Sequence, residues 1–257
     1  MNETWDRMLR SVFPYQLLAR VRMAQLYLSG DTNYYERSER RVLFYRALCL
    51  LWKNHISGDY VEFGCHGGMT FTLAYHHSQQ FQRPGTTRKL WAFDSFEGLP
   101  PQSGPKDAHP AWRQGWLKTS QEAFIDICTR SGIPRSAYEV VPGFYKDTIG
   151  KDAGNPPKQL PHDIAFAYID CDLYTSTQSV LEFLAPRQKH GMIIALDDYY
   201  CYSDEAAAGE RVALLEFLRN QDQYLLVPYV QYGYHGMSFI VEDRRFNSPD
   251  RALLMSH

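Results

Sequence analysis

Two short apolar runs, each followed by a pair of aspartates, constrain the fold of this chain more than any other feature. Residues 164–169 lead into Asp170 and Asp172, and residues 192–196 lead into Asp197 and Asp198. The sequence between the two runs is helix-like. Runs this short and this apolar, joined by a helix, are typical of buried parallel strands with a right-handed crossover.

The four aspartates are expected to share one edge of that sheet. Ligands of parallel α/β sheets bind beyond the carboxyl ends of the strands, which is where both pairs fall. Gathered carboxylates repel one another unless protons or a cation intervene, and a hard divalent cation with oxygen ligands is the simplest counter-charge. Alternatively, the aspartates could simply cap the loops at the strand ends. That would explain a single aspartate, but it explains two pairs on adjacent strands less well.

A glycine-rich turn follows an earlier strand. The segment 59–70 reads Asp-Tyr-Val-Glu62-Phe-Gly64-Cys-His-Gly67-Gly68-Met-Thr, a strand, a turn and the start of a helix. Glycines let a ligand approach the backbone, and the helix N-terminus offers unpaired N–H groups. The turn is neither Gly-x-Gly-x-x-Gly nor a P-loop, so the fingerprint of a nicotinamide dehydrogenase is missing.

The next strand, 89–94, also ends in an acid. Asp94 stands where comparable folds hold a ribose diol. A glycine turn preceded by one acid and followed by another on the second strand is a common way to hold S-adenosylmethionine. The cationic sulfonium of that cofactor suits an acidic and aromatic setting.

The remaining segments predict one α/β domain with an N-terminal extension. Residues 1–37 contain a probable helix after Pro14, whose apolar stripe favours covering a sheet face, with a lid or a dimer contact as the alternative. A longer helix is expected to open at Ser38. Residues 95–118 form a long proline-rich loop, of a kind that is usually functional or mobile. Residues 224–242 predict a closing hairpin. The expected fold of residues 38–257 is therefore a mostly parallel twisted sheet, five parallel strands plus an antiparallel pair, with helices on both faces.

Composition excludes several classes of protein. Of the 257 residues 44% are hydrophobic and 22% charged, the net charge is −2, and no basic stripe is present, so we expect no nucleic-acid partner. The five scattered cysteines form no Cys-x-x-Cys and favour a reducing compartment. No basic-then-apolar leader and no run of about 18 apolar residues is present, so a cytoplasmic protein without a membrane partner is expected.

Five segments, in order along residues 58–245, resemble the macrocin O-methyltransferase (TylF-type) family. They are Val61-Glu-Phe-Gly-Cys-His-Gly-Gly, Ala92-Phe-Asp-Ser-Phe-Glu-Gly-Leu-Pro, Val141-Pro-Gly-Phe-Tyr-Lys-Asp-Thr, Tyr168-Ile-Asp-Cys-Asp-Leu-Tyr-Thr-Ser-Thr and Leu196-Asp-Asp-Tyr. The resemblance implies a Rossmann-like class I methyltransferase fold. It also implies a Mg²⁺-dependent transfer of methyl from S-adenosylmethionine to a hydroxyl of a small molecule, typically a natural-product sugar, with a phenol as the other acceptor considered.

The resemblance also assigns roles to residues. Asp170, Asp197 and Asp198 match the metal ligands, and Asp172 matches the general base. The expected cofactor site comprises Glu62, Gly64, Cys65, His66, Gly67, Thr70, Asp94, Ser95, Phe96, Gly143 and Asp170. The chain departs from the family at Cys65-His66-Gly67, where an aliphatic, an aromatic and a basic residue are more usual.

Three other functions are consistent with parts of the sequence. The Asp170-x-Asp172 pair also resembles the nucleophile motif of Mg²⁺-dependent aspartate phosphatases, although that motif normally sits on the first strand. A nicotinamide dehydrogenase would share the fold but not explain Asp197 and Asp198. A non-catalytic nucleotide-binding scaffold would bind cofactor without turnover.

Overall fold

A seven-stranded sheet forms the centre of the molecule, with strand order β3-β2-β1-β4-β5-β7-β6. The computed structural model describes residues 15–30, 33–110, 112–151, 153–154, 156–202 and 207–246. The strands are β1 (Asp59–Phe63), β2 (Leu90–Asp94), β3 (Tyr138–Pro142), β4 (Ile164–Ile169), β5 (Ile193–Leu196), β6 (Tyr224–Tyr232) and β7 (Gly236–Asp243). Strands β1 to β5 are parallel, and β7 joins β5 and β6 antiparallel. The predicted parallel core with a closing hairpin is confirmed.

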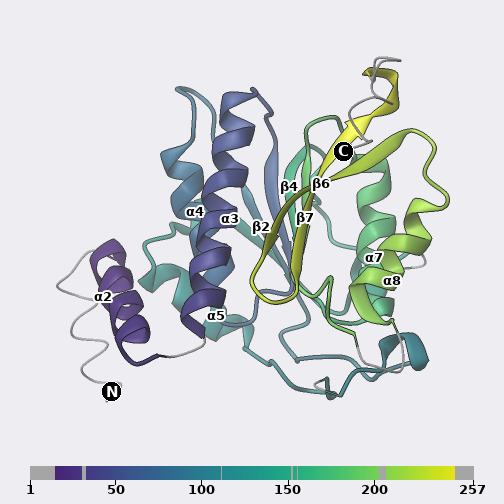
Figure 1. Ribbon diagram of the computed structural model, residues 1–257, viewed down its shortest axis with the longest axis horizontal. Helices are drawn as coiled ribbons and strands as arrows, with labels where there is room; N and C mark the ends of the chain where they lie inside the picture. The colour runs from purple at the N-terminus through teal and green to yellow at the C-terminus, as the bar shows by residue number, and fades with distance from the viewer. Residues whose placement is uncertain are drawn as a thin grey trace.

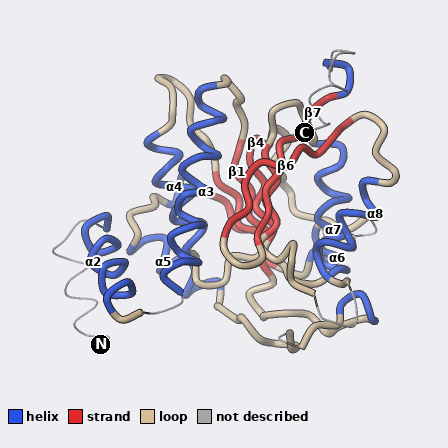
Figure 2. The backbone as a smooth tube through the Cα atoms, in the orientation of Figure 1, coloured by secondary structure: helices blue, strands red, loops and turns tan. Residues whose placement is uncertain are grey.

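Helices cover both faces of this sheet, as Figures 1 and 2 show. The α-helices of the described residues are α2 (Tyr15–Leu28), α3 (Asn33–Lys53), α4 (Met69–Gln80), α5 (Gln121–Arg130), α6 (Tyr145–Thr148), α7 (Tyr174–Leu184) and α8 (Gly209–Leu218). Helices α3, α4 and α5 pack on one face, and α7 and α8 pack on the other.

Side chains that point alternately to the two faces of the sheet form two hydrophobic cores, one on each face. On β1, Tyr60 packs into the core beneath α3 to α5, whereas Val61 and Phe63 pack into the core beneath α7 and α8. On β4, Phe166 and Ile169 divide in the same way. Because successive side chains on a strand point to opposite faces, a strand covered by helices on both faces must be apolar throughout. The continuous apolar runs in the sequence follow from this.

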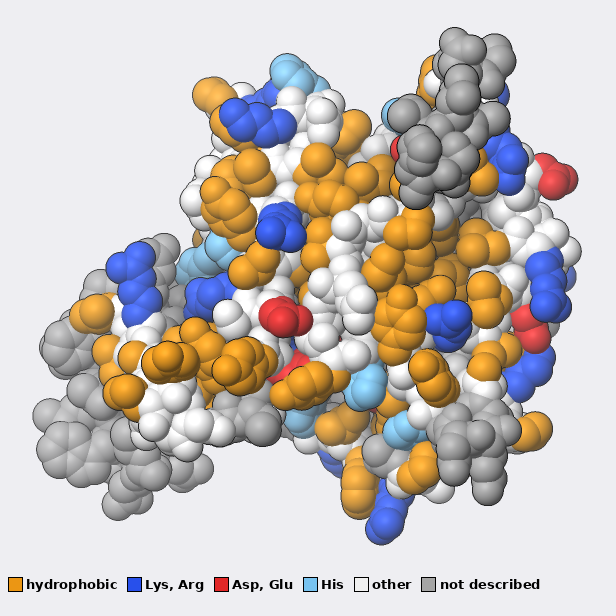
Figure 3. All heavy atoms as spheres, in the orientation of Figure 1, with side chains coloured by type: hydrophobic (Ala, Val, Ile, Leu, Met, Phe, Trp, Pro, Cys, Tyr) orange, Lys and Arg blue, Asp and Glu red, His pale blue; other side chains and the backbone are white. Residues whose placement is uncertain are grey.

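The N-terminal helices differ from expectation in two respects. Helix α3 begins at Asn33, not at Ser38, and so continues across the predicted start of the domain. Helix α2 packs beside α3 and does not cover the sheet (Figure 1). Its apolar side chains are largely exposed, with Val21 and Tyr27 at 58% and 62%. Hydrophobic side chains gather at the lower left of Figure 3, over the position of α2 in Figure 1. A stripe on a helix shows that a face is apolar, not which surface covers it. Residues 1–14 lie outside the described residues.

The long loop after β2 is pinned to the helices that follow the aspartate motifs. Helix α7 has no side-chain cap of its own, and the N–H of Thr175 in its first turn instead donates to Asp107 Oδ1 at 3.0 Å. Asp107 is buried and also accepts from the Ser103 N–H at 2.8 Å. Nearby, Lys106 Nζ lies 2.6 Å from Glu216 Oε1 on α8. This part of the loop is therefore an anchored structural element.

Replacing Asp107 by Ala is expected to destabilise the fold by about 1–3 kcal/mol, because it removes the acceptor of two partly buried N–H donors, one of which it caps at the start of α7. Differential scanning calorimetry should show a melting temperature lower by about 2–4 °C for each kcal/mol. Asp126→Ala is the matched control, since Asp126 pairs only at the surface with Arg130 on its own helix, at 3.0 Å. Equal melting temperatures for the two variants would contradict the capping role.

Within the described ranges, every helix is too short or too polar to traverse a bilayer.

Candidate active site

A cavity of about 960 Å³ opens at the carboxyl edge of the parallel strands. Its lining comes from the glycine turn after β1, the ends of β2, β4 and β5, the loop after β2, and the helices α2, α3, α6 and α7. Pockets for one drug-sized ligand span about 300–1,000 Å³. The cavity lies at the upper end of that range and can hold a ligand of that size.

The glycine turn approaches the end of β4 very closely. Gly64 has φ +90°, and a Cβ built there would lie 1.7 Å from the carbonyl oxygen of Asp170. Only glycine fits this backbone contact. The turn and the first aspartate motif are thereby held side by side.

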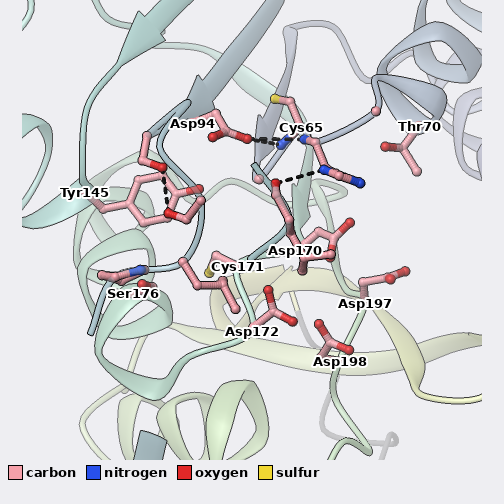
Figure 4. A pocket seen from close by; sticks show the side chains of 18 of the residues that line it. Cys65, Thr70, Asp94, Tyr145, Asp170, Cys171, Asp172, Ser176, Asp197 and Asp198 are labelled. Carbon is pink, nitrogen blue, oxygen red and sulfur yellow. Dashed lines mark hydrogen bonds between the residues drawn. The ribbon is translucent and has the colours of Figure 1, made fainter. Parts of the chain in front are cut away.

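Asp94 ties the turn to the end of the second strand (Figure 4). Its Oδ2 accepts the N–H groups of Cys65 and His66, at 2.7 and 3.2 Å, and its Oδ1 accepts the N–H of Phe96 at 2.7 Å. Each carboxylate oxygen has lone pairs beyond those used here. Asp94 also lines the cavity, so it can hold the turn and still accept a hydrogen bond from a ligand hydroxyl.

Glu62 occupies a different place from the one expected. It is fully buried and does not line the cavity. Its carboxyl accepts from the hydroxyls of Tyr60 and Thr70, the latter at 2.7 Å. Burial raises the pKa of Glu62 to about 8, so its carboxyl is mostly protonated at neutral pH. In this structure Glu62 joins the end of β1 to the start of α4 from behind the turn.

The other predicted cofactor residues divide between the lining and the interior. Those that line the cavity are Gly64, Cys65, His66, Gly67, Thr70, Asp94, Ser95 and Asp170. Phe96 is instead buried against Phe124, with ring centroids 5.8 Å apart. Gly143 lies behind the lining, where its N–H donates to the carbonyl oxygen of Asp94 at 2.9 Å.

The four aspartates converge as their positions on neighbouring strands require. Ile169 and Leu196 are register partners in β4 and β5, so Asp170 and Asp197 begin their loops side by side. Figure 4 shows Asp172 and Asp198 facing each other, with Asp170 and Asp197 beside them, and all four residues line the cavity.

Burial and mutual repulsion raise the pKa of three of these carboxyls, those of Asp170, Asp172 and Asp198. Burial, followed by the charges of Asp197 and Asp172, raises the pKa of Asp170 well above its usual range. Burial and the charge of Asp172 do the same for Asp198, and burial raises the pKa of Asp172 to about 6. A group of buried carboxylates in this state favours a cation among them.

Arg40 on α3 supplies one positive charge. Its Nε donates to Asp197 Oδ1 at 2.9 Å, its Nη2 contacts Asp197 Oδ2, and its Nη1 lies 2.8 Å from Glu36 Oε2. The Tyr168 hydroxyl donates to the same Oδ1 of Asp197. Both carboxylate oxygens of Asp197 are therefore bound by protein groups. The contact with Arg40 joins residues 157 positions apart, and no local pattern predicts it.

Glu210 on α8 is a fifth buried carboxyl that the sequence analysis missed. It is fully buried, and its two oxygens accept the N–H of Cys171 at 3.3 Å and the N–H of Asp198 at 3.0 Å. One side chain thus fastens the loop after β4 to the loop after β5. Glu210 holds the two aspartate motifs at a fixed separation.

The carboxylate oxygens of these aspartates are chemically suited to a hard divalent cation, but their side chains are not arranged as a metal site. Carboxylate oxygens are the ligands that Mg²⁺ prefers. Among the residues that the structure describes, however, no three acidic, histidine or cysteine side chains are placed to hold one ion together. For Asp197 the reason is visible, since Arg40 and Tyr168 already bind its carboxylate.

Comparison with known proteins identifies the family to which this chain belongs. Residues 38–220 match the model of the family described as Macrocin-O-methyltransferase (TylF). A Streptomyces olivaceus protein named 8-demethyl-8-(2,3-dimethoxy-alpha-L-rhamnosyl)-tetracenomycin-C 4'-O-methyltransferase is 32% identical over 156 residues, which are 56% of this chain and 54% of that protein. The chain spans about half the length of the curated relatives that it matches.

Two solved structures share the fold. The calicheamicin methyltransferase CalS11 superposes with a TM-score of 0.63 at 19% identity, over 89% of this chain and 93% of that one. The O-methyltransferase NovP superposes with a TM-score of 0.60 at 20% identity, over 80% of each chain. At these identities the likeness concerns the fold alone.

Proposed function

Because the chain belongs to the macrocin O-methyltransferase (TylF) family, we propose that it transfers a methyl group from S-adenosylmethionine to a sugar hydroxyl of a small molecule. The observation that carries the proposal is one cavity lined by both the glycine turn with Asp94 and the aspartates of β4 and β5. The tetracenomycin relative is by name a 4'-O-methyltransferase of a rhamnosylated compound, which supports a sugar acceptor. No observation gives comparable support to the phosphatase or scaffold alternatives.

The turn and Asp94 form the cofactor end of the cavity. S-adenosylmethionine supplies a methyl group on a cationic sulfonium. Gly64 and Gly67 keep the backbone open to a ligand, and Asp94 accepts hydrogen bonds from ribose hydroxyls. The neighbouring acids stabilise positive charge at this end.

The aspartates form the acceptor end. Asp172 is the proposed base that removes the proton of the acceptor hydroxyl, since its pKa of about 6 leaves it mostly ionised at neutral pH. Asp170, Asp197 and Asp198 would hold Mg²⁺, which would supply positive charge beside the acceptor oxygen. Arg40 and Tyr168 bind Asp197 in this structure. The protein then contributes mainly by positioning the two reactants.

Calorimetric titration with S-adenosylmethionine tests the cofactor half of this proposal. We expect saturable binding, both in a buffer containing Mg²⁺ and in one containing EDTA, because the cofactor contacts proposed here need no metal. Absence of binding in both buffers would end the methyltransferase proposal.

Methyl transfer to a panel of rhamnosylated aglycones tests whether the reaction depends on Mg²⁺. We expect EDTA to lower turnover at least about tenfold and added Mg²⁺ to restore it, since metal stabilisation of charge contributes several kcal/mol in such reactions. Ca²⁺ serves as a matched divalent control that prefers a larger coordination sphere. Full turnover in EDTA would reject the metal while leaving the methyltransferase assignment intact.

A further inference from the structure

Arg40 on α3 bridges two carboxylates of the cavity wall. Its Nε donates to Asp197 Oδ1 at 2.9 Å and its Nη2 contacts Asp197 Oδ2, so one guanidinium holds both oxygens of the first aspartate after β5. Its Nη1 lies 2.8 Å from Glu36 Oε2, one helical turn earlier on α3. A guanidinium that presents two N–H groups to one carboxylate makes one of the stronger ion pairs found in proteins. The contact with Asp197 is therefore both strong and directional.

This ion pair faces the cavity. Arg40, Asp197 and Glu36 all line it, and the side chains of Arg40 and Asp197 are 22% and 6% exposed. Helix α3 enters the hydrophobic core only at Leu43 and Phe44, beyond Arg40. A small ion in the cavity can therefore reach the Asp197 carboxylate without any change in the packing of the core.

Glu36 is held in place independently of Arg40. Its Oε1 accepts the N–H of Tyr234 at 2.6 Å, from the turn between β6 and β7. In the same turn Gly233 has φ +57°, and a Cβ built there would lie 2.6 Å from Glu36 Oε2, so glycine permits the close approach. Arg40 thus has a second, fixed carboxylate partner. An arginine with two such partners can release one of them without leaving its charge unpaired.

We propose that Arg40 competes with a divalent cation for Asp197 and thereby sets the affinity of the protein for that ion. The inference rests on the metal part of the proposed function and makes Arg40 a positioning residue that acts through Asp197. An ion on a lone pair of Asp197 that Arg40 leaves unused would stand beside the guanidinium, and the two positive charges would repel each other. Arg40 therefore moves toward Glu36 when an ion binds, and until then it neutralises and orients Asp197.

Titration with Mn²⁺, followed through the electron paramagnetic resonance signal of the free ion, tests the competition without acceptor or cofactor. Carboxylate oxygens suit Mn²⁺ as they suit Mg²⁺. Arg40→Gln should bind Mn²⁺ about ten- to hundredfold more tightly than the unaltered protein, because the ion no longer has to break a charge-assisted pair. Arg40→Lys keeps the charge but loses the paired N–H groups, so its affinity should lie between the two. The lysine variant decides the question if the glutamine variant does not fold.

Arg41→Gln is the matched control, because Arg41 is the next residue of α3 but lies near His76 and His77 and does not line the cavity. It should bind Mn²⁺ as the unaltered protein does. The melting temperature gives a second measurement: Mn²⁺ should raise it more in the Arg40→Gln variant than in the unaltered protein, since a tighter ligand stabilises the fold more. Equal Mn²⁺ affinity in the Arg40 and Arg41 variants, or weaker binding in Arg40→Gln, would overturn the proposal.

Two results distinguish failure of this inference from failure of the proposed function. If S-adenosylmethionine binds but neither the unaltered protein nor the Arg40 variants bind Mn²⁺, the competition is wrong and the methyltransferase proposal stands. If S-adenosylmethionine does not bind but the Arg40 variants still bind Mn²⁺ more tightly, the competition is supported and the methyltransferase proposal falls.

Discussion

Replacing Asp172 by Asn is expected to lower kcat by about 10²–10⁴-fold while leaving the KM for S-adenosylmethionine nearly unchanged. An amide cannot accept the proton of the acceptor hydroxyl, so the loss falls on the chemical step. Steady-state kinetics with a rhamnosylated acceptor would measure the effect.

The asparagine variant suits the local backbone. Asp172 has φ +61°, and asparagine tolerates this left-handed conformation better than other non-glycine residues. The side chain keeps its size, which matters because Asp172 is only 7% exposed. Alanine would add backbone strain and confuse the interpretation. Asp222→Asn, at an exposed turn remote from the cavity, is the control for a loss of one carboxylate. Near-normal turnover in the Asp172 variant would exclude this residue as the base.

The strands and the meeting of the aspartates could be predicted because both depend on local pattern. A strand covered on both faces is apolar along its whole length, and parallel neighbours must end at one edge. The acids after β4 and β5 therefore came together as expected. The same reasoning placed Asp94 at the cavity, next to the glycine turn.

The groups that hold these acids could not be predicted from pattern. Arg40 lies just before the residues of α3 that pack into the core, and nothing in its spacing marks it as the partner of Asp197. Glu210 lies in the first turn of α8, yet its carboxyl fastens two loops whose positions depend on the whole sheet. Such contacts arise from tertiary packing, which periodicity does not encode.

Glu62 was expected to contact a ligand, but its side chain lies in the core. An acid beside a glycine turn suggests a ligand contact, but alternation along β1 directs this side chain to the same face as Tyr60, into the core. The position of Glu62 two residues after Tyr60 was visible in the sequence. Its engagement by Thr70 was not, because it requires α4 to pack across the end of the strand.

Gly64→Ala is expected to be the most destabilising single change among those considered, costing on the order of 3–5 kcal/mol. Two penalties add: the backbone has φ +90°, and the new Cβ would lie 1.7 Å from the Asp170 carbonyl oxygen. That carbonyl cannot move freely, since the Asp170 N–H donates to Phe63 at 2.8 Å and the Gly64 N–H donates to Phe93 at 2.9 Å. Chemical denaturation should therefore show a large loss of stability, and the remaining folded protein should bind S-adenosylmethionine weakly.

Gly67→Ala provides the control within the same turn. A Cβ at Gly67 meets no atom within 4 Å, and its backbone has no positive φ. Its stability should stay within about 1 kcal/mol of the unaltered protein, because a tolerated glycine-to-alanine change mainly restricts the unfolded chain. The contrast separates two roles of glycine in one loop: Gly64 permits the contact that joins the cofactor corner to the aspartates, whereas Gly67 leaves space for a ligand. If both variants lost stability equally, the close approach of Gly64 to Asp170 would not be what holds the two halves of the site together.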